Sequence, residues 1–301
     1  MNELTLPEPL DRFEAKMPDG AVIRVRRHGN PAGRRVLLGH GNGFATNAYY
    51  PFWRHLGEDC ELIVYDQRNH GENPLFGAYG HHVDGFASDL QNVLAAVHSR
   101  FGPKPVFGAF HSVSAVAALA HAERWGWRWE RLVLFDPPIV PNADEALHAE
   151  AFASERFLAR WALERDFEFA GPEALADHLQ SVRGMQRWVP GAHALMARAL
   201  VTRRNGRWTL ACPRELEAKV YLSNAFAPVW QDLDRLARHR RRLLVLTGDP
   251  DLPGSKYPPR VGARLAERFG LTVEALPGTS HMLQLEEPVR AAARTLDFFF
   301  R

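Results

Sequence analysis

Six short apolar runs, spread along the 301-residue chain, constrain its fold more than any other feature. Their hydrophobicity is continuous rather than alternating, which is what a strand covered on both faces requires. Between the runs, apolar residues recur at helical spacing, so the pattern predicts a mostly parallel α/β sheet flanked by helices. The runs are residues 36–38, 62–65, 106–107, 132–135, 243–246 and 271–273. A hairpin over residues 11–27 precedes them, and an amphipathic helix over residues 289–300 closes the chain.

This alternation stops for about one hundred residues, from Pro137 to about Arg240, where helical patterns dominate. We therefore expect a core formed by residues 1–137 and 241–301, and a helical cap or lid formed by residues 138–240. A segment inserted between two strands of such a sheet would lie over their carboxyl ends, where open α/β sheets bind ligands. The insertion is rich in aromatic residues, and Trp161 and Trp188 are candidates for lining a substrate pocket.

Ser112 lies between the apolar run 105–109 and an alanine-rich helical stretch, residues 115–122. A serine at a sharp strand-to-helix turn has its hydroxyl held clear of both elements. The amides at the start of the helix then point toward any oxyanion that forms. This context makes Ser112 the candidate nucleophile and the amide of Val113 a candidate oxyanion donor. The neighbours Phe110 and His111 are candidates for the substrate pocket.

Two partners for Ser112 follow in chain order, Asp251 after the run 243–246 and His281 after the run 271–273. Serine, acid, histidine is the order of a nucleophilic triad built on a parallel α/β sheet. We expect Asp251 to orient His281 and His281 to take the serine proton. Asp249, two residues earlier, and Asp136, at the end of the run 132–135, are alternatives for the acid.

The loop His40-Gly41-Asn42-Gly43-Phe44 follows the first parallel strand. Its glycines allow the backbone to turn back toward the serine, so that the amide of Asn42 joins that of Val113 in binding an oxyanion. Phe44 is a further pocket candidate. Asp66 and Arg68, in the turn after the next strand, are expected to form a structural ion pair rather than to bind substrate.

Composition narrows the class of protein. A net charge of +2, from 37 basic and 35 acidic residues, gives no general attraction to nucleic acid. Two cysteines, Cys60 and Cys212, have no metal-type spacing, and no stretch approaches the ~18 apolar residues of a membrane-spanning helix. The adjacent side chains of His81 and His82 point apart, and no set of cysteines or carboxylates accompanies them, so we expect no metal site. A cytoplasmic protein with a small-molecule substrate and no membrane partner is expected, with a homodimer left open.

These segments together resemble the alpha/beta-hydrolase superfamily. The resemblance rests on His40-Gly41-Asn42-Gly43, Asp66-Gln67-Arg68-Asn69-His70-Gly71, the Ser112 turn, Gly248-Asp249-Pro250-Asp251 and Gly278-Thr279-Ser280-His281. It implies an eight-stranded, mostly parallel sheet with a cap inserted after the sixth strand. It also implies cofactor-free hydrolysis of an ester, thioester, amide or lactone.

One departure from the family pattern leaves alternatives open. The turn around the nucleophile normally has glycine two residues before and after the serine, where this chain has Phe110 and Ser114. The favoured interpretation is a serine esterase with an apolar substrate. The alternatives are a carbon–carbon hydrolase, an aminopeptidase or a perhydrolase on the same triad, or a non-catalytic ligand-binding protein in which Phe110 blocks the site.

Overall fold

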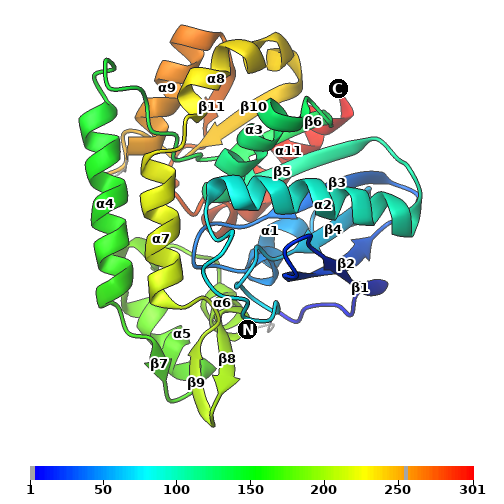
Figure 1. The fold of residues 1–301 in the computed structure, drawn as a ribbon, viewed down its shortest axis with the longest axis vertical. Helices are drawn as coiled ribbons and strands as arrows, with labels where there is room; N and C mark the ends of the chain where they lie inside the picture. The colour runs from blue at the N-terminus through cyan, green and yellow to red at the C-terminus, as the bar shows by residue number, and fades with distance from the viewer. Residues whose placement is uncertain (1–3, 254–256) are drawn as a thin grey trace.

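A computed structural model describes residues 4–253 and 257–301 and contains an eight-stranded sheet (Figure 1). The strand order is β1-β2-β4-β3-β5-β6-β10-β11; β1 pairs with β2, and β2 with β4, in antiparallel fashion, whereas the remaining neighbours are parallel. The strands are β1 (Asp11–Lys16), β2 (Val22–Gly29), β3 (Arg34–Gly39), β4 (Cys60–Tyr65), β5 (Val106–His111), β6 (Trp129–Phe135), β10 (Leu243–Thr247) and β11 (Thr272–Ala275). The predicted fold class and all six apolar strands are confirmed.

Helices cover both faces of this sheet, which explains why its strands are apolar throughout. In β3, Leu37 faces a core cluster that includes α2, α3 and α9, whereas Val36 and Leu38 face a second cluster that includes α1 and α11. The bounds of the covering helices are η1 (Thr46–Tyr49), α1 (Tyr50–Trp53), α2 (Val83–Phe101), α3 (Val113–Trp125), α9 (Tyr257–Phe269), α10 (Leu283–Glu286) and α11 (Pro288–Phe300). Among the described residues, no helix is both long and apolar enough to cross a membrane.

The insertion, residues 138–240, follows β6, the sixth strand along the chain, and comprises mainly helices, with α4 and α7 packed side by side (Figure 1). The expectation of a purely helical segment is incomplete, because β7, β9 and β8 form a three-stranded antiparallel sheet. Its hairpin turn is Asn205-Gly206, with φ of 50° and 79°, the residue pair that such two-residue turns favour. The elements are α4 (His148–Glu164), β7 (Glu168–Phe169), α5 (Pro172–Ser181), η2 (Arg183–Met185), α6 (Ala192–Leu200), β8 (Val201–Arg204), β9 (Arg207–Leu210), α7 (Arg214–Ala225) and α8 (Val229–Leu236); η3 (Ala237–Arg242) leads into β10.

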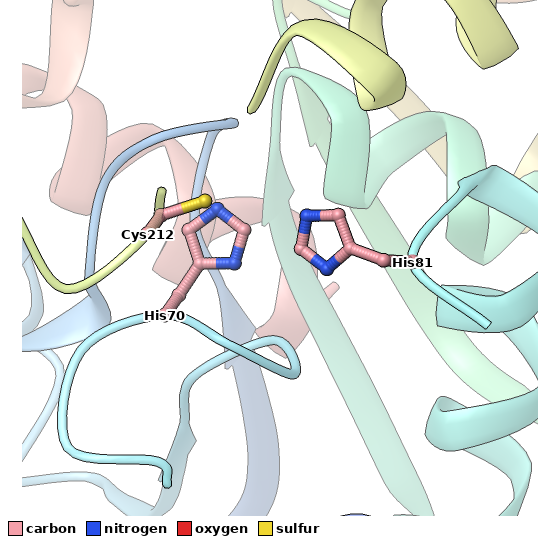
Figure 2. A group of neighbouring side chains, drawn as sticks. All are labelled: His70, His81 and Cys212. Atoms are coloured by element: carbon pink, nitrogen blue, oxygen red, sulfur yellow. The ribbon is translucent and has the colours of Figure 1, made fainter. Parts of the chain in front are cut away.

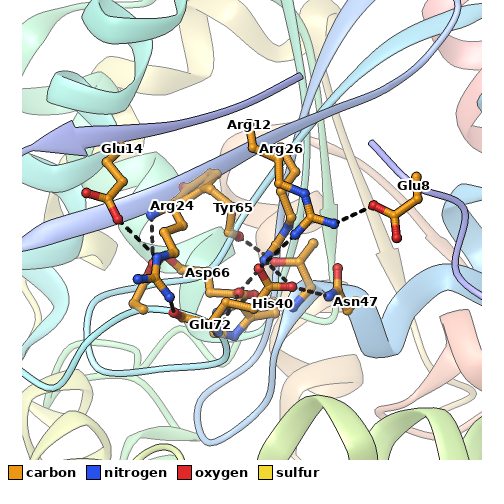
Figure 3. A network of polar contacts seen from close by, with 12 residues as sticks. Glu8, Arg12, Glu14, Arg24, Arg26, His40, Asn47, Tyr65, Asp66 and Glu72 are labelled. Atoms are coloured by element: carbon orange, nitrogen blue, oxygen red, sulfur yellow. Dashed lines mark hydrogen bonds and ion pairs between the residues drawn. The ribbon is translucent and has the colours of Figure 1, made fainter. Parts of the chain in front are cut away.

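A buried carboxylate, Asp66, stabilises the turn after β4 (Figure 3). It accepts hydrogen bonds from Arg26 Nη2 at 3.0 Å and from the backbone amides of Thr46 at 2.7 Å and Glu72 at 3.2 Å. Burial acts to raise the pKa of Asp66, but the charge of Arg26 and the two amide donors outweigh it and lower the pKa to about 2. Asp66 therefore joins β2, the loop after β3 and the loop after β4.

The prediction that Asp66 and Arg68 form an ion pair with each other is wrong, because each pairs with a different residue. Arg68 points away from Asp66 and forms a bidentate pair with the buried Asp89 of α2, with Nε 2.7 Å from Oδ2. Its Nη1 also lies 2.6 Å from Asp19, in the turn of the first hairpin. Both residues are structural, as expected, but each is neutralised by a residue distant in sequence.

Candidate active site

The turn between β5 and α3 carries Ser112 in a strained conformation. Its φ of 55° and ψ of −126° are rare for a residue with a side chain, and such strain persists only where the surrounding structure enforces it. The serine amide donates to Phe135 O of β6 at 2.9 Å, and its carbonyl accepts from the amide of Ala115 in α3 at 2.9 Å. The sheet and the helix together hold the hydroxyl at the carboxyl edge of the sheet.

The two residues that replace glycine in this turn are accommodated in different ways. Ser114 forms two hydrogen bonds with the backbone of His111, donating to its carbonyl at 2.7 Å and accepting from its amide at 3.0 Å. The ring of Phe110 is fully buried in the core and packs edge-on against Trp129, with ring centroids 5.3 Å apart. The room for this ring comes from Gly39 and Gly108, where a Cβ atom would lie 2.5 and 2.6 Å from it.

Phe110 is consequently not a pocket residue, and the prediction that it lines the pocket is wrong. Its side chain extends to the face of the sheet opposite to that of Ala109 and lies among residues of the first core cluster. The interpretation in which Phe110 blocks the site has no basis in this position.

Three side chains form a hydrogen-bonded relay. His281 Nε2 lies 3.1 Å from Ser112 Oγ, and His281 Nδ1 lies 2.6 Å from Asp136 Oδ2. Asp136 is 1% exposed, and its other oxygen accepts the amide of Gly248 at 3.0 Å. An ionised carboxylate can only accept, so His281 Nδ1 carries a proton toward it and Nε2 presents a lone pair to the serine. The imidazole therefore has the tautomer that can accept the serine proton.

The structure places Asp136, rather than Asp251, against His281. Asp251 is exposed, and its amide donates to Asp249 Oδ1 at 2.9 Å. Asp249 in turn accepts the amide of Gly278 at 2.8 Å, which fixes the loop after β11 rather than its histidine. Asp136 directly follows β6, the strand that pairs with β5, so it lies one strand away from Ser112. All three acids follow buried strands, and chain order alone does not distinguish them.

The loop after β3 lies against the serine, as its glycines suggested. A Cβ atom on Gly41 would lie 3.3 Å from Ser112 Cβ. At this separation any residue other than glycine would require a small shift of its neighbours. The loop's other amides have acceptors: Gly41 N–H donates to Tyr49 Oη at 3.2 Å, Gly43 N–H to His70 Nε2 at 3.1 Å, and Phe44 N–H to Gly41 O at 3.1 Å. Among the described residues, the amides of Asn42 and Val113 have no acceptor. They are the two amides expected to bind an oxyanion.

His111 connects this loop to the loop of His281 through hydrogen bonds of its ring. Tyr49 donates its hydroxyl proton to His111 Nδ1 at 2.7 Å, and His111 Nε2 donates to the carbonyl of His281 at 2.8 Å. Because Tyr49 also accepts the Gly41 amide, one chain of hydrogen bonds joins both loops beneath Ser112. Burial lowers the pKa of His111 well below its usual range, so the ring is neutral, as this chain requires. His111 is fully buried, and the prediction that it lines the pocket is wrong.

The remaining pocket candidates have different surroundings. Phe44 is partly buried and packs beside Gly41, so it lies next to the serine. Trp188 is 4% exposed and belongs to the second core cluster, with α5 and α6. Trp161, on α4, is 38% exposed, and the guanidinium of Arg165 lies 5.4 Å from its ring centroid. Of the three, only Phe44 has a contact that places it near Ser112.

One group of side chains has the donor types of a metal site. His70, His81 and Cys212 are buried and offer donors within 4.8 Å of one another, with Cys212 contributed by the insertion (Figure 2). The local sequence around His81 could not reveal this grouping. However, His70 Nδ1 donates to Arg68 O at 3.0 Å while Nε2 accepts the Gly43 amide, and His81 Nδ1 accepts from Asn69 Nδ2 at 3.0 Å. A metal ion bound through His70 Nε2 would have to displace the Gly43 amide, which argues against a metal here, although His81 Nε2 has no hydrogen-bond partner among the described residues.

Comparison with known proteins agrees with this fold. The model of the alpha/beta hydrolase family matches residues 36–295. The crystal structure of E-2-(acetamidomethylene)succinate hydrolase is similar over 97% of this chain and 100% of its own, with 16% identity and a TM-score of 0.74. An alpha/beta hydrolase from Novosphingobium aromaticivorans (97% and 99% covered, 18% identity, TM-score 0.73) and a thermophilic esterase from Thermogutta terrifontis (96% and 98%, 20%, 0.68) are also similar.

Proposed function

Since the chain belongs to the alpha/beta hydrolase family, we propose that it is a serine hydrolase that cleaves a carboxylic ester through an acyl-enzyme. The observation that carries this proposal is the relay in which His281 bridges Ser112 Oγ and the buried carboxylate of Asp136. Thioesters, lactones and amides present the same carbonyl to the nucleophile and belong to the same proposal.

Catalysis begins when Ser112 Oγ attacks the substrate carbonyl and its proton passes to His281 Nε2. The imidazolium that forms lies 2.6 Å from Asp136, whose negative charge stabilises it. The same proton then passes to the leaving alkoxide, so the alcohol departs and the acyl group remains on the serine. A water molecule, deprotonated by His281, releases the acid and restores Ser112.

The tetrahedral intermediate needs donors for its oxyanion. We assign this role to the amides of Asn42, in the loop after β3 that lies against Ser112, and of Val113, the first residue of α3. Neither has an acceptor among the described residues, so binding an oxyanion breaks no hydrogen bond within the protein. Each such donor contributes about 3–4 kcal/mol to lowering the barrier.

A small, largely apolar acyl group is the substrate class that this site favours. Phe44 packs beside Gly41 next to the serine, and the insertion is rich in aromatic residues. A carbon–carbon hydrolase, an aminopeptidase or a perhydrolase would use the same relay. Product analysis on an ester, a diketone and an aminoacyl substrate distinguishes these reactions from ester cleavage.

Covalent labelling with a fluorophosphonate probe tests the proposal directly. The wild-type protein is expected to become labelled on Ser112 and to hydrolyse short p-nitrophenyl esters, and Ser112→Ala is expected to lose both properties. Ser114→Ala is a matched control, because it removes a hydroxyl two residues away that is bonded only to the backbone of His111. Persistent labelling of Ser112→Ala, or an unlabelled wild-type protein, would contradict the proposal.

A further inference from the structure

The insertion contacts the loop that carries the Asn42 amide. Asn42 Nδ2 donates a hydrogen bond of 2.9 Å to the backbone carbonyl of Glu217, which lies in α7 of the insertion. Asn42 is 5% exposed and Glu217 is 1% exposed, so water does not compete for this bond. The side chain of the residue that offers the oxyanion amide is therefore held by the insertion and not by the core.

The approach of α7 to this loop is close enough to require glycine at the next position. A Cβ atom on Gly43 would lie 2.6 Å from Glu217 Oε1, and the φ of 74° at Gly43 disfavours any side chain there. On the core side, His70 accepts the Gly43 amide. The loop is thus fixed between a core histidine and an insertion helix.

Glu217 is itself held within the insertion. Its carboxylate lies 2.6 Å from Nη2 of Arg165, the residue that follows α4, so this ion pair ties α4 to α7. Burial raises the pKa of Glu217, and the charge of Arg165 opposes that rise. Movement of this helix pair would therefore carry the Glu217 carbonyl with it.

The chain retains a polar residue at position 42 despite an energetic disadvantage. Asn42 Oδ1 is buried and has no hydrogen-bond partner among the described residues. A buried acceptor without a partner destabilises a fold, and an apolar residue of similar size would avoid that cost. The bond from Nδ2 to α7 gives a reason for an amide at this position.

We propose that the insertion positions the oxyanion amide, with α7 holding the side chain of Asn42 through the carbonyl of Glu217. The Asn42 amide then points at the reacting carbonyl only while α7 is seated on the loop. Glu217 acts as a positioning residue, because it touches the loop and not the substrate. This inference rests on the proposed serine hydrolase function and adds control of that function by the insertion.

Two variants at Asn42 and a matched control test the inference. Asn42→Ala removes the side-chain bond but keeps the backbone amide, and Asn42→Asp keeps the shape but places an acceptor against the Glu217 carbonyl. The control is Asn224→Ala, because Asn224 is also buried in α7 and donates a hydrogen bond of 2.9 Å to Pro138 O, at the start of the insertion, without touching the loop. The assays are kcat and KM for a p-nitrophenyl ester, affinity for a boronic acid that forms a tetrahedral adduct, and the Tm of each variant.

Asn42→Ala is expected to lower kcat about 10-fold, less than the roughly 10²–10³-fold effect of losing an oxyanion donor outright. Asn42→Asp should lower it further, with KM within about twofold and boronate affinity reduced by the same factor as kcat. Asn224→Ala should lower Tm by a similar amount but change kcat less than about twofold, because the oxyanion amide keeps its place.

The outcomes separate this inference from the proposed function. Unchanged kcat in both Asn42 variants, in an enzyme whose Ser112 is labelled, would overturn the positioning role and leave the hydrolase proposal intact. An equal loss of kcat in Asn224→Ala would also overturn it, since any loosening of the insertion would then have the same effect. A wild-type protein without covalent labelling would overturn both.

Discussion

Replacement of Asp136 by asparagine tests the identity of the acid in the relay, for which the sequence offered three candidates. The Gly248 amide donates to Asp136 Oδ1 at 3.0 Å, so an asparagine must turn its carbonyl oxygen toward that donor. Its amide group then faces His281 Nδ1, which becomes an acceptor. The proton moves to Nε2, 3.1 Å from Ser112, and the imidazole can no longer take the serine proton.

The size of the effect follows from this inversion of the tautomer. The corresponding change in a serine protease lowers kcat by about 10⁴, which corresponds to about 5 kcal/mol of barrier. Because asparagine is nearly isosteric and keeps the bond to Gly248, the fold should remain intact. We therefore expect Asp136→Asn to lose about 10⁴-fold in ester turnover and to label with a fluorophosphonate far more slowly, with little change in Tm.

The control is Asp251→Asn, at an exposed residue that does not contact His281. Its turnover is expected to stay within about twofold of wild type, since exposed substitutions away from the site have small effects. Substantial turnover in Asp136→Asn, or a large loss in Asp251→Asn, would refute the assignment of Asp136 as the orienting acid.

Two further predictions concern stability and are measured by urea denaturation. Gly39→Ala is expected to destabilise the fold by about 1–3 kcal/mol, because its Cβ would lie 2.5 Å from the Phe110 ring. In Phe110→Ala, the same glycine substitution should cost less, with the contact to Ser114 Oγ at 2.9 Å remaining, and equal costs in the two backgrounds would contradict this packing. Asp66, with a pKa lowered to about 2, is expected to contribute stability that is fully present above pH ~4 and is lost as the pH falls toward 2, roughly 2 kcal/mol in all. In Asp66→Asn this part of the pH dependence should disappear, and an unchanged pH profile would show that Asp66 is not ionised in the fold.

Much of the architecture could be predicted because it is encoded in local patterns. A strand buried on both faces needs a continuous apolar run, and the run at 36–38 divides its side chains between the two core clusters as that rule requires. Ser112 and His281 could be found because each occupies a loop at a fixed place in the order of strands. The hairpin at Asn205-Gly206 carried a strong local signal that was overlooked within a segment dominated by helical patterns.

The parts that could not be predicted depend on which strands are neighbours. Asp136 and Asp251 both follow buried strands, and only the pairing of β6 with β5 places Asp136 beside Ser112. The position of Phe110 depends in the same way on Gly39 of the adjacent strand, which supplies the space that glycine usually supplies within the turn. The hydrogen bond between Asn42 and Glu217 joins residues 175 positions apart, and no local sequence motif predicts it.

The point at which the insertion leaves the core has a practical consequence for protein engineering. Asp136 is pinned to the sheet by its amide, which donates to Leu246 O at 2.7 Å, and the chain enters Pro137-Pro138 immediately afterwards. The carbonyl of Pro138 accepts from Asn224 of the insertion and from Tyr257 of α9, both at 2.9 Å. Chimaeras that exchange insertions between relatives should therefore be joined after Pro138. The new insertion should also contain a side chain that donates a hydrogen bond to the Pro138 carbonyl. A splice made one or two residues earlier would replace the stiff proline pair that anchors the acid, and a well-folded chimaera could then lack activity.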